Sequence, residues 1–259
     1  MIMVTGGSGF IGSNFIKAAI SKKSWSLVNF DALTYAGNPE NLAAFDQEQN
    51  YVFWHGSICD RTMLDAVVLD AQPNYIVNFA AESHVDRSIS DAGVFLQTNI
   101  FGTYTLLESA LAYWRGLSST KQKAFRFLHI STDEVYGSLT ADAPGFTENS
   151  SFAPNSPYSA SKASSDHLVR AYFHTYGLPV LTINCSNNYG PFQFPEKLIP
   201  LSIVKALQGE TLPIYGDGQQ IRDWLFVDDH CDAIFDTLEL GKIGETYNVG
   251  GNSERTNLQ

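Results

Sequence analysis

Short apolar runs alternate with amphipathic stretches along most of the chain. The apolar runs predict buried parallel strands, at residues 2–5, 27–30, 52–55, 75–79, 125–130 and 180–184. Asp60 can cap a helix over residues 61–71, and Ser156 with Pro157 can begin another that ends at Gly177. Because strands and helices alternate, the pattern predicts an α/β fold of the Rossmann type, with a doubly wound parallel sheet.

The pattern changes after residue 185, where proline, glycine and asparagine become frequent. Tyr215-Gly216-Asp217-Gly218 is a hairpin signal, and residues 229–240 have the pattern of a helix. We therefore expect residues 1–185 to form a nucleotide-binding domain to which the helix at 229–240 returns. Residues 186–259 would begin a smaller substrate-binding lobe.

Composition and charge narrow the classes of function. The chain has 259 residues, of which 44% are hydrophobic, and its net charge of −11 disfavours a nucleic-acid partner. Cys59, Cys185 and Cys231 are an odd number of widely spaced cysteines, which predicts neither a disulfide framework nor a metal site. No stretch is long and apolar enough to predict a membrane span, so we expect a cytoplasmic enzyme.

Glycines follow the first predicted strand, in the run Thr5-Gly6-Gly7-Ser8-Gly9-Phe10-Ile11-Gly12. Such a turn lets the backbone approach a pyrophosphate at the amino terminus of the next helix. Asp31 ends the second predicted strand, where a carboxylate can accept hydrogen bonds from a ribose and repel a 2′-phosphate. This arrangement predicts an NAD site and favours NAD over NADP.

Two further motifs carry candidate chemistry. Asp133 and Glu134, in Ser131-Thr132-Asp133-Glu134, follow the fifth strand, where one carboxyl group could give a proton and the other remove one. Tyr158 and Lys162 lie four residues apart at the start of the capped helix and so share a helix face. A nearby lysine ammonium favours the phenolate form of tyrosine, which makes Tyr158 a candidate base.

Together these segments resemble the dTDP-glucose 4,6-dehydratase family of extended short-chain dehydrogenases/reductases. The similarity runs nearly from end to end, through residues 5–12, 31–38, 80–88, 131–137, 158–162, 184–191, 194–200 and 222–224. The Asp133-Glu134 pair distinguishes this family from sugar-nucleotide 4-epimerases, which are expected to carry small polar residues there.

The resemblance implies site residues. The cofactor NAD would contact Gly6, Gly9, Phe10, Ile11, Gly12, Asp31, Ala32, Leu33, Thr34, Ser57, Ile58, Phe79, Ala80, Ala81, Ser83, Thr98, Tyr158, Lys162 and Asn188. The nucleotide sugar would contact Ser83, Thr132, Asn187, Lys197, Leu198, Pro213, Ile214, Tyr215, Arg222 and Asn257. The catalytic set would be Thr132, Asp133, Glu134, Tyr158 and Lys162.

The implied reaction is the dehydration of dTDP-glucose to dTDP-4-keto-6-deoxyglucose, a step of deoxysugar (rhamnose-type) nucleotide biosynthesis. Tyr158 would assist oxidation at C4, Glu134 would remove the C5 proton, and Asp133 would protonate the departing 6-hydroxyl. A UDP-sugar 4-epimerase or dehydratase is one alternative. A catalytically inactive NAD-binding remnant is the other.

The resemblance has two departures and one corollary. Ser57 stands where the family usually has an aspartate facing the adenine, and the family continues beyond Gln259 with further helices and an Arg-rich segment. On that basis the chain looks truncated, with apolar surface expected around residues 199–240. The stripe of Leu96, Ile100, Thr103, Leu107 and Ala110 predicts a helix that is mostly core, and in this family such helices also pair in a homodimer.

Overall fold

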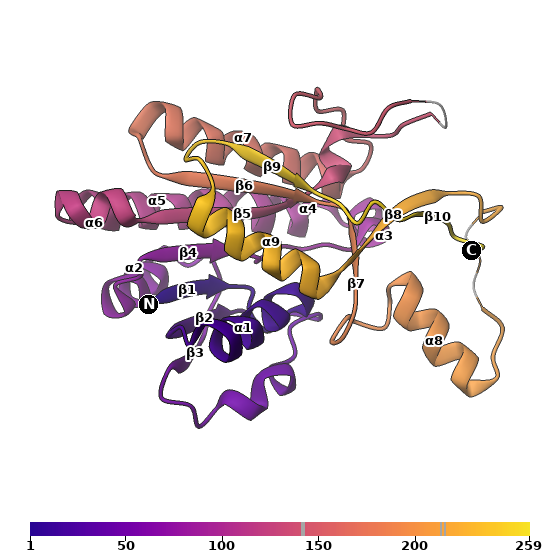
Figure 1. Ribbon diagram of the computed structural model, residues 1–259, viewed down its shortest axis with the longest axis horizontal. Coiled ribbons are helices and arrows are strands. Elements are labelled where there is room, and N and C mark those ends of the chain that lie inside the picture. The colour runs from indigo at the N-terminus through magenta and orange to yellow at the C-terminus, as the bar shows by residue number, and fades with distance from the viewer. Residues whose placement is uncertain (141–142, 213, 215) are drawn as a thin grey trace.

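A parallel sheet of seven strands forms the centre of the fold in the computed structural model, which describes residues 1–140, 143–212, 214 and 216–259 (Figure 1). Its order is β3-β2-β1-β4-β5-β6-β9. The strands are β1 (Ile2–Thr5), β2 (Leu27–Asp31), β3 (Tyr51–His55), β4 (Tyr75–Asn78), β5 (Arg126–Thr132), β6 (Val180–Cys185) and β9 (Thr246–Val249). Because the order reverses between β1 and β4, a crevice opens there at the carboxyl ends of the strands. The predicted α/β class is confirmed.

Helices cover both faces of this sheet (Figure 1). On one face lie α1 (Phe10–Lys23) and α9 (Val227–Leu240), and on the other lie α2 (Arg61–Ala71), α5 (Thr103–Arg115) and α7 (Pro157–Tyr176). Successive side chains of a strand point to opposite faces, so Ile2 and Val4 pack with α1 and α9 whereas Met3 packs with α2 and α5.

The predicted helix caps are present. Asp60 accepts a hydrogen bond from the Met63 N–H at 3.0 Å and begins α2. Ser156 and Ser159 form a capping box at the start of α7, with Pro157 in its first turn, and Gly177 ends that helix in a left-handed conformation. The start of α7 therefore fixes where Tyr158 and Lys162 lie.

Two local predictions were wrong. β3 is an edge strand, so Val52, Phe53 and Trp54 are exposed and only Tyr51 of this strand is buried. The expected helix from Leu96 onward begins as a π-helical segment, η2 (Leu96–Gly102), before α5. The wider turn changes the register of the stripe, which leaves the Leu96 side chain 42% exposed.

The remaining elements are short or peripheral. They are η1 (Pro39–Phe45), α3 (Val85–Ser90), α4 (Ala92–Phe95), α6 (Ser119–Ala124), η3 (Asp133–Tyr136), α8 (Leu198–Gln208), and a second sheet of β10 (Glu254–Thr256), β8 (Ile221–Phe226) and β7 (Asn187–Tyr189). Figure 1 shows α8 set apart from the main body, beside the second sheet. None of its residues is buried, and Ile203 and Leu207 are exposed.

Apolar exposure in the last part of the chain is confined to certain elements. Between residues 199 and 240 it occurs on α8, at Leu212, Ile214 and Ile221, and at Leu240, whereas the rest of α9 buries Val227, Ile234 and Phe235 against the large sheet. The expectation of exposed apolar surface is met for the first group and is wrong for most of α9. Within the described part of the chain, no helix is long and apolar enough to cross a bilayer.

Candidate active site

A cleft of about 700 Å³ lies at the carboxyl ends of β1, β4 and β5 and reaches the second sheet. It brings together most of the residues that the sequence assigns to a cofactor. These are Gly6, Gly9, Phe10, Ile11, Gly12, Asp31, Ala32, Thr34, Ser57, Ile58, Phe79, Ala80, Ala81, Ser83, Thr98, Tyr158, Lys162 and Asn188. The same wall carries the predicted substrate and catalytic residues Thr132, Glu134, Asn187, Lys197, Leu198, Arg222 and Asn257.

A few predicted site residues do not line the cleft. Leu33, Asp133 and Ile214 are absent from its wall, and the Ile214 side chain is 56% exposed. The Leu33 N–H donates to Asp31 Oδ1 at 2.7 Å, so Leu33 shapes the loop beside the cleft. The predictions for Pro213 and Tyr215, and with Tyr215 the start of the hairpin signal, lie outside the described residues.

The turn after β1 fits a dinucleotide phosphate. Gly6 has a φ of +73°, and a Cβ placed there would lie 2.5 Å from the Ala80 nitrogen, so only glycine suits the position. Gly9, which precedes α1, provides no side-chain cap. The first N–H groups of α1 therefore lie at the cleft without a competing side chain, as an NAD pyrophosphate requires.

Asp31 is held at the far end of this turn. Its Oδ2 accepts from the Ser8 N–H at 2.9 Å, which ties the end of β2 to the glycine run. Burial raises the pKa of the carboxyl group, and hydrogen bonds from the Leu33 and Ser8 N–H groups oppose that rise. A fixed carboxylate at this place fits the ribose of NAD.

The carboxyl groups of η3 both have raised pKa values. Burial and, next, the neighbouring Glu134 raise the pKa of Asp133 to about 6. Burial also raises the pKa of Glu134, whereas the Arg222 guanidinium and the Lys197 ammonium oppose that rise. Thr132 contacts both residues, since its Oγ1 donates to Asp133 Oδ1 at 3.4 Å and accepts from the Glu134 backbone N–H at 3.3 Å.

Tyr158 and Lys162 line the cleft one helical turn apart. Burial raises the pKa of Tyr158 well above its usual value, and the carboxylate of Glu134 adds to the rise. The sequence predicts that Lys162 lowers the pKa of Tyr158, and this lowering is not found in the protein alone. Lys162 Nζ instead donates to the Ile130 carbonyl at 2.8 Å, and burial lowers its pKa to about 8.

Cationic side chains lie on the substrate side of the cleft. Lys197 Nζ donates to the Ser83 carbonyl oxygen at 3.0 Å, and Arg222 Nη1 donates to Asn187 Oδ1 at 3.5 Å. β10 pairs with β8, so Asn257, the residue after β10, is placed near Gln220, the residue before β8. An ammonium and a guanidinium on one wall can bind the two phosphates of a sugar nucleotide.

Sequence reasoning missed a contact beside the cleft that we call the Tyr35 clasp, made of Tyr35, Arg87 and Glu196, of which Glu196 lines the cleft. The Arg87 guanidinium lies 3.8 Å from the centre of the Tyr35 ring, and its Nη2 donates to Glu196 Oε2 at 3.2 Å. Tyr35 also meets the Phe194 ring edge-on, with centres 5.9 Å apart. The clasp joins the loop after β2 to the loop before α8, and no local sequence pattern signals this pairing.

His129 and Asp166 were also missed, although they lie directly behind Lys162. His129 Nε2 is 3.4 Å from both Lys162 Nζ and Asp166 Oδ1. For Asp166 a signal existed, because Tyr158, Lys162 and Asp166 are spaced by four residues and share one face of α7. His129 sits inside an apolar strand, where a lone histidine gives no such signal.

Comparison with known proteins points to one group of enzymes. The model of the family described as GDP-mannose 4,6 dehydratase matches residues 3–259. The dTDP-glucose 4,6-dehydratase of Xanthomonas campestris pv. campestris (strain B100) is 60% identical over 257 residues, which are 99% of this chain and 73% of that protein. The solved dTDP-glucose 4,6-dehydratase DesIV of Streptomyces venezuelae, with NAD bound, is 47% identical with a TM-score of 0.92, covering 99% of this chain and 77% of that chain.

The fold is shared with epimerases as well. The solved UDP-glucose 4-epimerase of Thermotoga maritima is 30% identical with a TM-score of 0.88, covering 100% of this chain and 79% of that chain. Structural likeness alone thus leaves two reactions open. The higher identity to the dehydratases favours dehydration.

Proposed function

The chain belongs to the GDP-mannose 4,6 dehydratase family, and we propose that Tyr158, Asp133 and Glu134 perform the proton transfers of an NAD-dependent dTDP-glucose 4,6-dehydratase. The enzyme is a hydro-lyase that converts dTDP-glucose to dTDP-4-keto-6-deoxyglucose. The single observation that carries the assignment of residues is the position of η3. η3 follows the end of β5, so Asp133 and Glu134 are adjacent there, and Glu134 lines the cleft that holds Tyr158.

The first step acts on the 4-hydroxyl of the sugar. NAD, which the glycine run and Asp31 would hold, would supply the two-electron chemistry by accepting a hydride from C4 and returning it to C6. Tyr158 takes the proton of the 4-hydroxyl, and Thr132 orients the oxygen. Lys162 supports the phenolate by its positive charge.

The elimination uses the two carboxyl groups. The ketone at C4 acidifies the hydrogen on C5, so that Glu134 removes it as a general base. Asp133 gives its proton to the 6-hydroxyl, the C6–O bond breaks, and water leaves with formation of a C5–C6 double bond. When C6 is reduced, Glu134 returns its proton to C5. A pKa of about 6 keeps Asp133 partly protonated near neutral pH, as a general acid requires.

We also propose that the enzyme is a homodimer. Phe101 and Tyr104, on η2 and α5, are 58% and 46% exposed. Tyr176 is exposed on α7, which packs beside α5. Large apolar and aromatic side chains on neighbouring helices suit a symmetric contact with a second copy of the chain.

A reducing compartment fits the cysteines. Cys59, Cys185 and Cys231 are free thiols in the structure, and two of them are buried. We accordingly propose that the enzyme works in the cytoplasm.

The deciding experiment is incubation of the purified chain with dTDP-glucose, with UDP-glucose in parallel. We expect the 4-keto-6-deoxy product from dTDP-glucose and NAD retained on the protein. A C4 epimer formed without loss of water would show an epimerase, and bound NAD without any product would show an inactive binding protein. Tyr158→Phe is the matched control, because it should retain NAD and lose turnover about 10²-fold to 10⁴-fold.

A further inference from the structure

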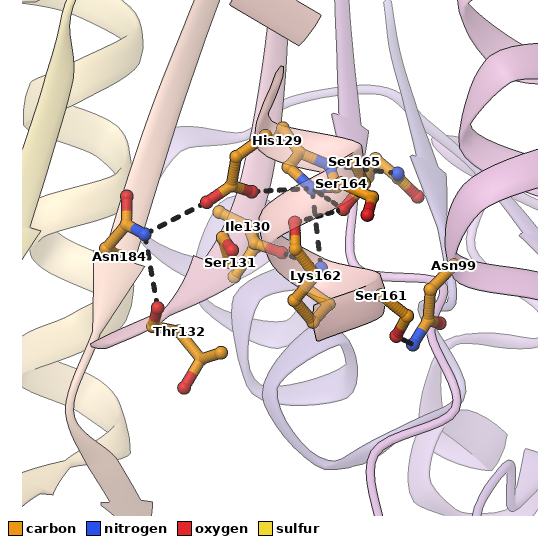
Figure 2. Close-up of polar contacts among 12 residues, drawn as sticks. Asn99, His129, Ile130, Ser131, Thr132, Ser161, Lys162, Ser164, Ser165 and Asn184 are labelled. Carbon is orange, nitrogen blue, oxygen red and sulfur yellow. Dashed lines mark hydrogen bonds and ion pairs between the residues drawn. The ribbon is translucent and has the colours of Figure 1, made fainter. Parts of the chain in front are cut away.

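A buried polar network surrounds Lys162 (Figure 2), and its members His129, Ser165 and Asp166 do not line the cleft. The Lys162 ammonium is 3.4 Å from His129 Nε2, and that ring nitrogen is 3.1 Å from Ser165 Oγ and 3.4 Å from Asp166 Oδ1. Each of these four residues is at most 6% exposed. Charged groups so deeply buried require partners, so their arrangement carries information about function.

Hydrogen bonds fix which nitrogen of His129 carries the proton. Thr5 Oγ1 donates to Asn78 Oδ1 at 2.7 Å, which directs the Asn78 amide to donate to His129 Nδ1 at 3.2 Å. The imidazole proton is therefore on Nε2 and faces Ser165 and Asp166. Burial lowers the pKa of His129 to about 4, so the ring is neutral at neutral pH.

Asp166 is the negative charge that faces Lys162. Burial lowers the pKa of Lys162, and the Asp166 carboxylate is the main influence that raises it. The other titratable groups around the pair are His129 on β5, Cys185 on β6, Tyr136 on η3 and Tyr158 on α7. The pKa values of the Cys185 thiol and the Tyr136 phenol are raised to about 12, and that of Tyr158 is raised well above its usual value. These three groups are therefore neutral, as is His129.

Asp166 is also linked to Thr132, the last residue of β5, through Asn184. Asn184 Nδ2 donates to Asp166 Oδ2 at 3.1 Å and to the Thr132 carbonyl oxygen at 3.1 Å. Figure 2 shows Asn184 linked by a dashed line to Thr132. The Asp166 carboxylate is thus linked to Lys162 through His129 and to Thr132 through Asn184.

We propose that Asp166 is a positioning residue for the dehydration, which keeps Lys162 in its ammonium form across the neutral His129 ring and holds Thr132 through Asn184. The inference rests on the proposed roles of Tyr158 and Lys162. Asp166 does not line the cleft, so it acts only through these residues. Its consequence is the pH range in which Tyr158 can serve as a base.

The test is the pH dependence of kcat/KM in Asp166→Asn. Without the carboxylate, Lys162 loses its proton at lower pH, and Tyr158 without a nearby ammonium ionises only at higher pH. We expect kcat to fall at least about tenfold at pH 7 with KM little changed, and the acidic limb of the profile to move up by about one pH unit or more. Asp166→Glu should restore part of the wild-type profile.

Three controls separate this role from a purely structural one. Asp70→Asn removes an equal charge from an exposed site on α2 that does not line the cleft, and should leave the profile unchanged. Asp166→Leu replaces the carboxylate by an apolar side chain of similar size, and it is the second test of charge removal if Asp166→Asn does not fold. In a Lys162→Met background, Asp166→Asn should cost little further activity, because the residue acts through Lys162.

The proposal is overturned if Asp166→Asn keeps the wild-type profile, or if its loss of activity adds in full to that of Lys162→Met. It is also overturned if Asp166→Asn and Asp166→Leu both unfold or lose bound NAD, since Asp166 is then structural. Absence of product from the wild-type chain would instead refute the proposed function, so the two failures are distinguishable.

Discussion

Glu134 lies on the wall of the cleft, whereas Asp133, the residue before it, does not. The tight turn of η3 points their side chains in different directions. Asp133 accepts its hydrogen bond from Thr132, and Glu134 lies in the field of Arg222 and Lys197. Two carboxyl groups that are adjacent in the chain therefore have different surroundings, which suits one acid and one base.

Glu134→Gln should separate oxidation from elimination. An amide cannot remove the C5 proton, whereas Tyr158 is untouched, so oxidation at C4 should still occur. We expect the reduced cofactor to accumulate when the variant is mixed with dTDP-glucose, as followed by nicotinamide absorbance, with product formation lowered about 10²-fold to 10⁴-fold. Turnover at the wild-type rate would show that Glu134 is not the base.

Asp133→Asn should stabilise the fold while it impairs catalysis. The pKa of Asp133 is raised from 3.8 to about 6 in the folded protein, so the folded state binds its proton more tightly than the unfolded state. Ionisation of Asp133 therefore destabilises the folded protein as the pH rises above about 4. At pH 7 it lowers the free energy of unfolding by up to about 3 kcal/mol.

Thermal unfolding at several pH values checks this prediction. The melting temperature of Asp133→Asn should exceed that of the wild type at pH 7, and the difference should narrow as the pH falls toward about 4. Asp70→Asn is the control for loss of one charge at an exposed site. A difference that is constant with pH would rule out titration of Asp133 as its cause.

Ser57→Asp should lengthen the residence of NAD. Ser57 lines the cleft, and its Oγ accepts from the Cys59 N–H at 3.2 Å. A carboxylate is a stronger acceptor for the adenine amino group and should add about 1 kcal/mol, or a several-fold slower release. Release is measured by trapping free NAD from the purified protein. Faster release would place the adenine elsewhere.

Phe101→Glu should shift the protein toward monomer. A charge within an apolar contact costs several-fold in association, and Phe101 is 58% exposed in the single chain, so folding itself should be little affected. Sedimentation across a range of concentrations measures the effect. Leu69→Glu, at an exposed position on α2, is the matched control. An unchanged dimer would place the interface on another face.

The strands and caps could be predicted because their signals are local. Apolar runs marked the bounds of β1 to β6 to within two residues, and Asp60, Ser156 and Gly177 marked helix ends by their own chemistry. The glycine run and Asp31 defined the cofactor side in the same way.

What the sequence did not predict depends on contacts between distant segments. The edge position of β3 follows from the order of strands, and η2, the π-helical segment that begins at Leu96, packs against the distant helix α7. Asp166 becomes informative only when β5 and β6 bring His129 and Asn184 to it. Side-chain direction, as at Asp133, is equally a property of the folded turn.

The Tyr35 clasp has a consequence for how the enzyme responds to metabolism. The clasp ties the loop after β2 to the loop before α8, and Thr34 and Glu196 of these loops line the cleft, so we expect the clasp to slow the exchange of bound NAD. A cofactor that finishes each cycle in its starting oxidation state has no need to leave. The rate should consequently follow the number of chains that hold NAD and be indifferent to the ratio of oxidised to reduced NAD in the cell.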